Sequence, residues 1–600
     1  MTHQPDGTNP DSEPAKNSEP AGSDASMESS HDAIGSAPWS VPTERFETSP
    51  DQPVTTVDRG RNPGRRAVLG TVVGTAIIAL AQAVGPMTDH QLANLGSGVV
   101  FLVALLYVLY QLHCLVKQSG YRYVVPGLAV AVVATLAVMF RLEGFSGEMM
   151  PQFAYRFSND RMAFRSLGES TSDDSVAGDQ ALADSTGFLG SERTAVILDR
   201  QFDIPKAIDE AEVVWDQGIG DGWSSFAVSG DRAVTLEQRD DIECVTCYRL
   251  SDGELLWMVS HEARHEHALG GVGPRSTPTI DAGRVYAQGA TGMLWCLDLA
   301  NGDEIWSVDL LDLAGWDKLA SEAAITWGRS GSPLVIDGEL CVIPFAGPEL
   351  NAETGRSLLA VDAQTGKTRW AAGEDQISYA SPGLLTLGGQ RQIVSVNEKT
   401  ITGHRVDDGT VLWETEWFGE SNGGANCAMA VQAGPNRFLI GKGYGGGSAL
   451  FEVTKPAGVW KVEPIWESNR ILKTKFTHAA VVDDVAYAIS NGSLEAVGIE
   501  EGERSWSQGR RSRFGQGQIL VVEDVIVGQT EPGEVVFVAA DPSEYRELLR
   551  LPALTAKTWN VPTIAGRHLL VRNDRQAICF RLPERRDANV AADKSAATQD

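Results

Sequence analysis

The sequence contains little cysteine and little positive charge. Its seven cysteines are odd in number and scattered over 600 residues, so they do not indicate a regular disulfide framework. Lys and Arg number 50 against 79 Asp and Glu, which gives a formal net charge of −29. Phosphate backbones repel so acidic a chain, and we expect no nucleic-acid partner. The length predicts one large folded unit with appendages.

Large apolar residues are sparse in three segments of the chain. Residues 1–60 are rich in Ser, Pro, Asp, Glu and Gly, residues 158–187 are small and acidic, and residues 584–600 are small and polar. Such segments bury too little apolar surface to offset the entropy lost on ordering. The sequence therefore predicts a disordered acidic N-terminal tail, a flexible acidic linker and a disordered C-terminal tail.

Long apolar runs are concentrated between residues 66 and 141. Three of them, at 67–87, 95–116 and 123–140, approach the roughly 20 residues that a membrane-spanning helix needs. Three such runs in close succession disfavour buried core helices. We predict a membrane anchor of three transmembrane helices.

The charges that flank these runs predict their orientation. Basic residues precede the first run and separate the second from the third, at Arg59, Arg61, Arg65, Arg66, Lys117 and Arg122. The loop 85–94 contains neither Lys nor Arg. By the positive-inside rule, the N-terminus is cytoplasmic and the remainder of the chain is exported. We expect a protein of the bacterial inner membrane whose C-terminal part is periplasmic.

A second interpretation of the first run stays open. The pair Arg65-Arg66 before an apolar stretch is similar to a twin-arginine signal, with Ala79-Leu80-Ala81 as its cleavage site. Two spans would remain even then. We favour an uncleaved anchor.

An eleven-residue phrase recurs along the chain. Its copies are CYRLSDGELLW, CLDLANGDEIW, AVDAQTGKTRW, GHRVDDGTVLW and AVGIEEGERSW, ending at Trp257, Trp306, Trp370, Trp413 and Trp506. Each copy has a glycine four residues before the tryptophan and a small residue ten before it. The glycine dipeptides signal tight turns between short strands, and two further strands precede each phrase. The repeating unit is therefore predicted to be four-stranded.

The number of units predicts the fold. Weaker copies end at Trp466 and near Trp559, and Trp215 precedes the first full unit. A four-stranded unit of about 40–50 residues repeated this often indicates a β-propeller. Three strands remain after Trp559, and the strand AEVVW that ends at Trp215 supplies the fourth. We predict an all-β, eight-bladed propeller over 205–583, with antiparallel blades and closure by the N-terminal strand.

Two cysteines, Cys244 and Cys247, are close enough in sequence to suggest a redox dithiol or half of a metal site. They lie in a predicted strand, where residues three apart point to opposite faces with Cα atoms about 10 Å apart. The second cysteine recurs in other units as Cys296 and Ala360. There is neither a C-x-x-C-H pattern nor a second cysteine pair. We interpret both cysteines as packing residues.

The units resemble the pyrroloquinoline-quinone-type propeller repeat, small-x-Asp-x-x-Thr-Gly-x-x-x-Trp, which Thr365-Gly366 and Trp370 match most closely. In that family each tryptophan packs between neighbouring blades. The resemblance implies this docking role for Trp215, Trp257, Trp306, Trp370, Trp413, Trp466 and Trp506. More loosely, the chain looks like membrane-tethered propellers related to the outer-membrane assembly protein BamB.

The resemblance implies two functions. A BamB-like propeller would be a non-catalytic scaffold without a cofactor, with a protein partner at the propeller face. BamB-type proteins are lipoproteins, and because this chain has no lipobox it would act from the inner membrane. The alternative is a tethered dehydrogenase that holds pyrroloquinoline quinone over calcium. Its specific residues cannot be placed, no two cysteines are adjacent and the blades are close to minimal length.

Polar and aromatic residues precede several predicted inner strands, in motifs such as Arg-Ser-Thr-Pro. Inner strands begin near the channel of a propeller, where such side chains can converge into a binding site. The candidates are Arg275, Trp327, Arg329, Tyr379, His478 and Asn560. The alternative is structural, since Ser/Thr-Pro begins a strand where no donor is needed. No triad order or metal-ligand spacing stands out, so no catalytic or metal residue is assigned.

Overall fold

The computed structural model describes residues 63–84, 90–117, 120–158, 184–347, 356–421, 423–509 and 512–585. The predicted N-terminal tail, the linker up to 183 and the C-terminal tail from 586 lie outside the described residues.

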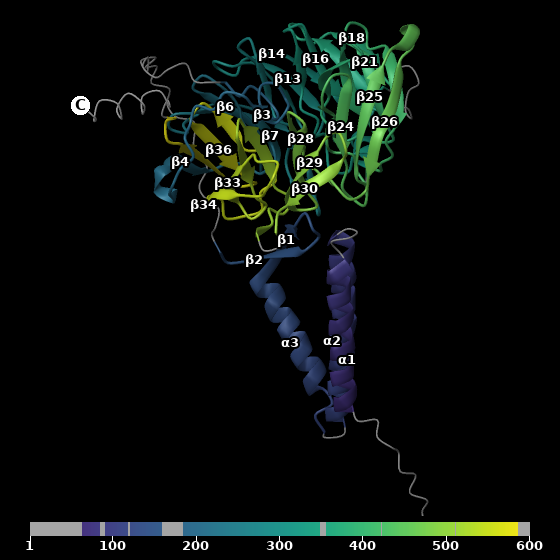
Figure 1. Ribbon diagram of the computed structural model, residues 1–600. Helices are drawn as coiled ribbons and strands as arrows, with labels where there is room; N and C mark the ends of the chain where they lie inside the picture. Colours follow the sequence, from purple (N-terminus) through teal and green to yellow (C-terminus); the bar gives the residue numbers. More distant parts are fainter. Residues whose placement is uncertain are drawn as a thin grey trace, which may run out of the picture. The chain divides into compact units, whose positions relative to one another are not determined.

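Three apolar helices come first in the described chain, α1 (Pro63–Val84), α2 (His90–Val116) and α3 (Val124–Met139) (Figure 1). Two are long and apolar enough to cross a membrane, over Pro63–Ala83 and Ala93–Val116. At 16 residues α3 is shorter, and its length of about 24 Å at 1.5 Å per residue is less than a ~30 Å hydrocarbon core. The prediction of three spans is thus corrected to two candidate spans, because the third apolar run becomes a strand at Phe140.

The helices α1 and α2 pack against each other through small residues. A Cβ atom at Gly70 would lie 2.5 Å from the Tyr107 ring, and one at Gly74 would lie 2.9 Å from the Ala104 Cβ. Glycines four apart are typical of helix pairs that pack in lipid. Side chains on the outside of the pair, such as Leu102 and Val103, are exposed.

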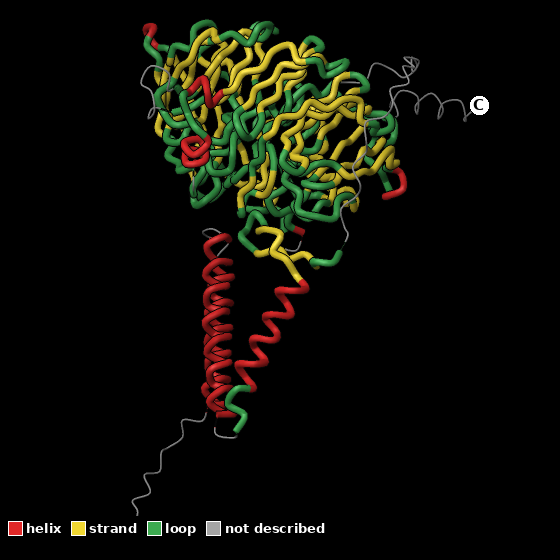
Figure 2. Tube along the Cα trace, turned by 180° about the vertical axis from the view of Figure 1, so that it is seen from behind, coloured by secondary structure: helices red, strands yellow, loops and turns green. Residues whose placement is uncertain are grey.

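In the described residues, thirty-two strands form eight blades of four antiparallel strands each, and β3 adds a fifth, parallel strand to the sheet of blade 7 (Figures 1 and 2). Blade 1 contains β5 (Ala227–Ser229), β6 (Arg232–Arg239), β7 (Ile242–Arg249) and β8 (Leu255–Glu262); blade 2 contains β11 (Thr279–Asp281), β12 (Arg284–Gln288), β13 (Met293–Asp298) and β14 (Glu304–Asp309). Blade 3 contains β15 (Leu334–Ile336), β16 (Leu340–Pro344), β17 (Leu358–Asp362) and β18 (Thr368–Ala372); blade 4 contains β19 (Gly383–Leu387), β20 (Gln390–Val396), β21 (Thr400–Arg405) and β22 (Val411–Glu416).

The second half of the ring is built in the same way. Blade 5 contains β23 (Val431–Gln432), β24 (Arg437–Gly441), β25 (Ser448–Thr454) and β26 (Lys461–Ser468); blade 6 contains β27 (Ala480–Val482), β28 (Val485–Ser490), β29 (Ser493–Gly498) and β30 (Glu503–Ser507). Blade 7 contains β31 (Gln518–Val522), β32 (Val525–Gln529), β33 (Glu534–Ala539) and β34 (Glu547–Pro552); blade 8 contains β35 (Thr563–Ala565), β36 (His568–Arg572), β37 (Gln576–Arg581) and β4 (Glu212–Gly218).

Blade 8 closes the ring with a strand from the beginning of the domain. The strand β4 pairs antiparallel with β37, with Trp215 opposite Cys579 and Glu212 opposite Arg581. This confirms the predicted eight blades and their closure by the N-terminal strand. Closure of this kind leaves neither end of the ring as an unpaired edge.

The short elements outside the blades are few. They are β9 (Glu266–His267) and β10 (Gly271–Val272) before blade 2, α4 (Leu310–Ala314) and α5 (Lys318–Ala324) before blade 3, and η4 (Pro456–Gly458) within blade 5. β3 (Val196–Ile197) and η3 (Ile208–Glu210) precede β4, and the hairpin β1 (Phe140–Phe145) and β2 (Pro151–Tyr155) follows α3.

The repeated tryptophans lie between neighbouring blades. The indole N–H of Trp306 in blade 2 donates to the Ala363 carbonyl of blade 3 at 3.0 Å. The equivalent bonds to the next blade are Trp215–Leu250, Trp257–Leu299, Trp370–Val406, Trp466–Ile499 and Trp506–Asp541. Trp413 differs: it donates to Gln392 of its own blade at 2.6 Å and stacks on Phe438 of blade 5.

The turn in each repeated phrase requires its glycine. Gly302 has a φ of 78°, which a residue with a side chain rarely adopts. A Cβ atom there would also lie 2.8 Å from the Trp257 ring of the preceding blade. The turn therefore needs glycine both for its backbone and to admit the tryptophan.

Blade 7 has no docking tryptophan. Pairing places Leu549 opposite Phe537, where most other blades place a tryptophan opposite a small residue, as Trp306 opposite Cys296. The weak repeat near Trp559 was therefore misassigned, since Trp559 follows β34 and lies elsewhere. Phe202, from the segment before β4, packs on Phe537 instead, with ring centroids 6.5 Å apart.

Residues 184–204 cross the centre of the ring. Ser185 exchanges backbone hydrogen bonds with Val228 of blade 1. Arg193 donates to the carbonyls of Ser332 and Pro333 before blade 3 and of Pro382 before blade 4. β3 runs parallel to β31 of blade 7.

The conformation of this central segment is unusual. Leu189, Arg193 and Ala195 have φ values of 63°, 57° and 59°, in the left-handed region. Such residues are costly and persist where their surroundings dictate them; Leu189 and Ala195 are indeed buried. The predicted linker, 158–187, therefore ends too late, because residues 184–187 already belong to the propeller.

Candidate binding site at the channel mouth

A cavity of about 310 Å³ lies at the mouth of the ring, between the loops of the blades on one side and the start of α2 and the β1–β2 hairpin on the other. Its walls are largely aromatic, formed by Phe188, Trp223, Trp327, Tyr379, Tyr444, Phe476 and Trp559. Phe188 comes from the central segment, and the other six come from loops that join or precede strands of the blades. Gln91 and Leu95 of α2 and Ser146, Gly147 and Met149 of the β1–β2 hairpin also line it.

The aromatic rings form two groups. Trp559 lies between Trp223 and Phe476, with ring centroids 4.8 and 4.9 Å apart. Trp327 lies against Tyr379 at 5.1 Å and against Tyr444 at 6.4 Å. Tilted and offset contacts at these distances are favourable, so the two groups form preorganised walls.

Arg275 is the charged side chain of the cavity lining. Its guanidinium donates to the backbone carbonyls of Gly273 at 3.0 Å and Gly270 at 2.7 Å. Burial lowers the pKa of Arg275 to about 10, which still leaves it charged at neutral pH. No carboxylate is among the described lining residues, and none of the described carboxylates acts on the pKa of Arg275.

His478 is not arranged as a base. Its Nδ1 accepts from the Met429 N–H at 3.4 Å, and its ring meets the Phe188 ring edge-on at 5.1 Å. Burial, followed by the nearby Arg193 charge, lowers the pKa of His478 to about 3. The imidazole is therefore neutral at physiological pH and resists protonation.

The tip of the β1–β2 hairpin is bound at the cavity entrance through Gly147. The Gly147 N–H donates to Glu531 at 2.5 Å, and its carbonyl accepts from Gln91 of α2 at 2.9 Å and from Lys475 at 3.4 Å. A Cβ atom on Gly147 would overlap the Gln516 side chain. The buried Glu531 also accepts from the Trp559 indole at 3.0 Å, so one carboxylate ties the hairpin to the aromatic wall.

Charge pairs hold the rest of the hairpin against blades 6 to 8. Arg575 pairs with Glu143 at 3.0 Å, and Arg513 pairs with Glu148. Lys557 donates to the Phe145 carbonyl at 3.1 Å. The side chain of Asn94 in α2 donates to the Glu148 carbonyl at 2.8 Å. The first turns of α2 and the hairpin after α3 thus meet the propeller at one place.

The structure brings together four of the six predicted mouth residues. Arg275, Trp327, Tyr379 and His478 line the cavity. Arg329 is buried beside it and donates to the Phe345 carbonyl at 2.6 Å, while Asn560 is buried and donates to the Ser224 carbonyl at 2.7 Å. Those two side chains brace loops of the ring and do not reach the cavity, so their prediction as lining residues is corrected.

Other lining residues were missed by sequence reasoning. Phe476 and Trp559 open the motifs Phe-Thr-His-Ala and Trp-Asn-Val-Pro, in the same position as Trp327 and Tyr379, and could have been found by that equivalence. Tyr444 lies in the glycine-rich loop 443–448. Gln91 and Phe188 come from outside the repeats, where no periodicity marks them.

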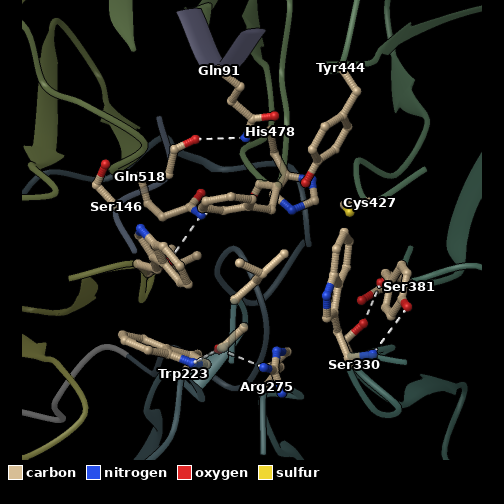
Figure 3. Close-up of a pocket in the computed structure, with 18 of the residues that line it drawn as sticks. Gln91, Ser146, Trp223, Arg275, Ser330, Ser381, Cys427, Tyr444, His478 and Gln518 are labelled. Atoms are coloured by element: carbon tan, nitrogen blue, oxygen red, sulfur yellow. Dashed lines mark hydrogen bonds between the residues drawn. The ribbon is translucent and has the colours of Figure 1, made fainter. Parts of the chain in front are cut away.

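The cavity does not fit a quinone held over calcium. Calcium takes six to eight oxygen ligands that include carboxylates, and the described lining offers none. No group of three or more His, Cys, Asp or Glu side chains that could hold a metal ion is found in the described residues. The lining chemistry is that of an apolar site with one cation (Figure 3).

The cysteines are placed for packing. Cys247 in β7 lies opposite Trp257, and both Cys244 and Cys247 are fully buried. Burial raises the pKa of each of these thiols to about 12. Cys427 lines the cavity, and burial raises its pKa to about 12 as well. All seven cysteines are free thiols.

Comparison with solved structures finds other propellers. BamB from Moraxella catarrhalis is 16% identical, with 63% of this chain and 99% of that chain covered and a TM-score of 0.43. A europium-containing methanol dehydrogenase is 10% identical, with 67% and 98% covered and a TM-score of 0.49. A quinohemoprotein alcohol dehydrogenase from Pseudomonas putida HK5 is 12% identical, with 68% and 81% covered and a TM-score of 0.48.

No curated protein sequence matches the chain. The sequence model of the family described as outer membrane protein assembly factor BamB matches residues 201–350 and 316–508, which together span more than half of the chain. These ranges contain the docking tryptophans from Trp215 to Trp506 and blades 1 to 6. The chain therefore belongs to the BamB family of propeller proteins.

Proposed function

We propose that the chain is a membrane-anchored, extracytoplasmic scaffold that binds another protein through its propeller, in the manner implied by its family. The observation that carries this proposal is the occupied centre of the ring. Residues 184–204 cross it, and the β1–β2 hairpin covers its mouth. A propeller whose centre holds its own chain offers its loops and outer strands for binding.

The proposed orientation rests on where the helices meet the propeller. Gln91 and Asn94, at the start of α2, bond to the hairpin tip, which in turn bonds to Glu531 of the propeller. The basic residues Arg65, Arg66, Lys117 and Arg122 belong to the other ends of the helices. By the positive-inside rule those ends are cytoplasmic and the propeller is outside. A C-terminal reporter that works only in the cytoplasm should be inactive, and an active one would contradict this orientation.

One surface has the features of a protein-binding groove. It has a volume of about 700 Å³ and lies between blades 4 and 5, lined by Phe418, Lys442, Glu467 and Arg470 among others. The Phe418 side chain is 67% exposed, which is unusual for a large aromatic residue. An exposed ring flanked by charges resembles the aromatic anchors of protein interfaces.

The scaffold proposal is tested by affinity capture of the full chain from solubilised membranes. The wild-type chain should recover a stoichiometric protein partner, and F418E should lose it. The matched control is L319E, because Leu319 in α5 is 75% exposed but distant from the groove in sequence. Recovery of no stoichiometric partner by the wild-type chain would contradict the scaffold proposal, and equal recovery by F418E would exclude this groove.

The alternative proposal, a quinone-dependent dehydrogenase, has no support from the cavity lining. It is tested separately by measuring quinone absorbance and calcium-dependent dye reduction with the purified chain. We expect neither signal. Dye reduction that requires both quinone and calcium would overturn the scaffold proposal.

A further inference from the structure

The charge of Arg275 is not balanced by the protein around it. Two backbone carbonyls accept from its guanidinium, and no carboxylate is among the described residues that line the cavity or act on the pKa of Arg275. A guanidinium has five N–H donors, and a charge removed from water is expensive unless it is paired. The nearby Lys557, whose Nζ lies 4.2 Å from the centroid of the Trp559 ring, is balanced by the carboxylates of Asp574, Glu531 and Glu143, so the unbalanced charge is that of Arg275. This end of the cavity therefore favours an anion.

The remainder of the cavity favours an apolar group. Trp327, Tyr379, Tyr444 and Phe476 present ring surfaces, and the volume of about 310 Å³ is at the lower end of the range of small-molecule sites. A small inorganic anion would cover little of this ring surface. The lining therefore matches a ligand with one charged end and an apolar remainder.

The cavity also has a direction. Figure 3 shows Gln91 and Arg275 at opposite ends. Gln91 and Leu95 belong to α2, whose candidate membrane span begins at Ala93. The apolar end of a ligand bound at Arg275 would thus leave the cavity beside the outer end of a membrane helix, where tryptophan and tyrosine are characteristic of the lipid–water boundary.

We propose that this cavity binds a bilayer lipid with an anionic head group, with the head group at Arg275 and the hydrocarbon chain leaving past Gln91 and Leu95. The proposal rests on the proposed membrane anchoring, but not on the protein partner. Bound lipid would join the propeller to the membrane at the same place as the hairpin. The site would thereby couple the orientation of the propeller to the presence of anionic lipid.

Calorimetric titration of the full chain in maltoside detergent tests the head-group and chain requirements together. The probes are octyl phosphate, octanol and inorganic phosphate, each used below any micelle-forming concentration. Octyl phosphate should bind with one-to-one stoichiometry, octanol at least tenfold more weakly and inorganic phosphate at least a hundredfold more weakly. R275Q should weaken octyl phosphate binding at least tenfold. The control R369Q, at an exposed position on β18, should bind as the wild-type chain does.

A second variant keeps the test decisive if R275Q does not fold. L95W narrows the exit beside α2. It should weaken the binding of octyl phosphate and leave the binding of inorganic phosphate unchanged. If octanol binds as tightly as octyl phosphate, the cavity is an apolar pocket that does not recognise the charged group. Inorganic phosphate binding as tightly would make it a simple anion site, and displacement of octyl phosphate by pyrroloquinoline quinone would assign it to a quinone. Each of these results overturns the proposal.

The lipid itself is tested in nanodiscs of phosphatidylcholine with one fifth phosphatidylglycerol. Wild-type chain extracted from them should retain phosphatidylglycerol by mass spectrometry, and R275Q should not. Equal retention by both, or retention of phosphatidylcholine alone, contradicts an anionic-lipid site. These measurements need no protein partner, so their failure is distinct from failure of the scaffold proposal.

Discussion

The rim of the propeller and its centre are built from contacts of different range. At the rim, Trp306 of one blade bonds to Ala363 of the next, and the same contact recurs around most of the ring. At the centre, residues 184–204 touch blades 1, 2, 3, 4, 6 and 7, and none of these contacts is repeated. The rim is a sum of similar neighbour contacts, whereas the centre depends on one segment.

The two regions meet between blades 7 and 8. There the rim lacks its tryptophan, and Phe202 from the central segment packs on Phe537 in its place. The last blade is itself completed by β4, which directly follows this segment. The central segment, residues 184–204, therefore supports the part of the rim that departs from the repeat. Loss of that segment should affect the ring more than loss of any one repeat contact.

The largest effect is expected from deleting residues 212–218, which removes β4. Blade 8 would keep three strands and the ring would open, because Trp215 would no longer bond to Leu250 of blade 1. We expect the free energy of unfolding to fall by more than about 5 kcal/mol, which is comparable with the whole stability of many domains. Thermal unfolding of the full chain in detergent measures this. Deletion of 162–180, within the predicted linker, is the control and should leave the transition unchanged. An unchanged transition without β4 would show that closure does not support the ring.

The next prediction compares a blade junction made by a tryptophan with the junction made by Phe202. W306A removes a repeat contact and F202A removes the central segment's substitute for one. Both side chains are buried, so each truncation should cost about 3–5 kcal/mol. Chemical denaturation of the two variants measures both values. If F202A lowers the free energy of unfolding by less than about 1 kcal/mol, the junction between blades 7 and 8 does not depend on the central segment.

The rim was predictable and the centre was not, for a physical reason. Each unit needs a glycine at its turn, because the turn has a positive φ and receives the indole of the preceding blade, as Gly302 receives Trp257. The phrase therefore recurs in every such unit with the same register. Residues 184–187 were predicted to belong to the linker, because Ser, Thr and Gly occur both in flexible linkers and in tightly packed segments between strands. The hairpin tip at Gly147 gives no signal either, since its partner Glu531 lies hundreds of residues away. Four mouth residues were found because they open equivalent strands, whereas Gln91 and Phe188 have no equivalent.

A third prediction concerns a buried carboxyl group between two blades. Glu243 in β7 accepts from the Ala290 N–H at 2.7 Å and from the Thr291 hydroxyl at 3.1 Å, both in blade 2. Burial raises the pKa of Glu243 to about 7. The folded chain therefore keeps a proton that the unfolded chain releases near pH 4.5, and the stability contributed by Glu243 falls as the pH rises from about 4.5 to 7.

The variant E243Q isolates this contribution, because glutamine keeps the acceptor without titrating. The difference in unfolding free energy between wild type and E243Q should change by on the order of 2–3 kcal/mol between pH 4.5 and pH 7.5, in favour of the variant at the higher pH. Thermal unfolding at several pH values measures it. A difference that is constant with pH would show that the carboxyl group has the same pKa in the folded and the unfolded chain, as an exposed one would.

The smallest effect is expected at the cysteines of the rim. Cys247, Cys296 and Cys579 lie opposite Trp257, Trp306 and Trp215, where other blades have Ala360, Gly403 and Ala496 opposite their tryptophans. Because the ring already uses alanine and glycine at the position of Cys247, and because alanine removes only one sulfur atom from the buried Cys244, replacing both cysteines with alanine should cost only about 1–2 kcal/mol. The pKa values of about 12 leave both thiols protonated, so alkylation of the folded chain at pH 8 should be slow. Binding of any protein partner or of octyl phosphate should be unchanged. Loss of either activity in a variant that unfolds at the wild-type temperature would give the pair a chemical role, and would show that the rim also carries function.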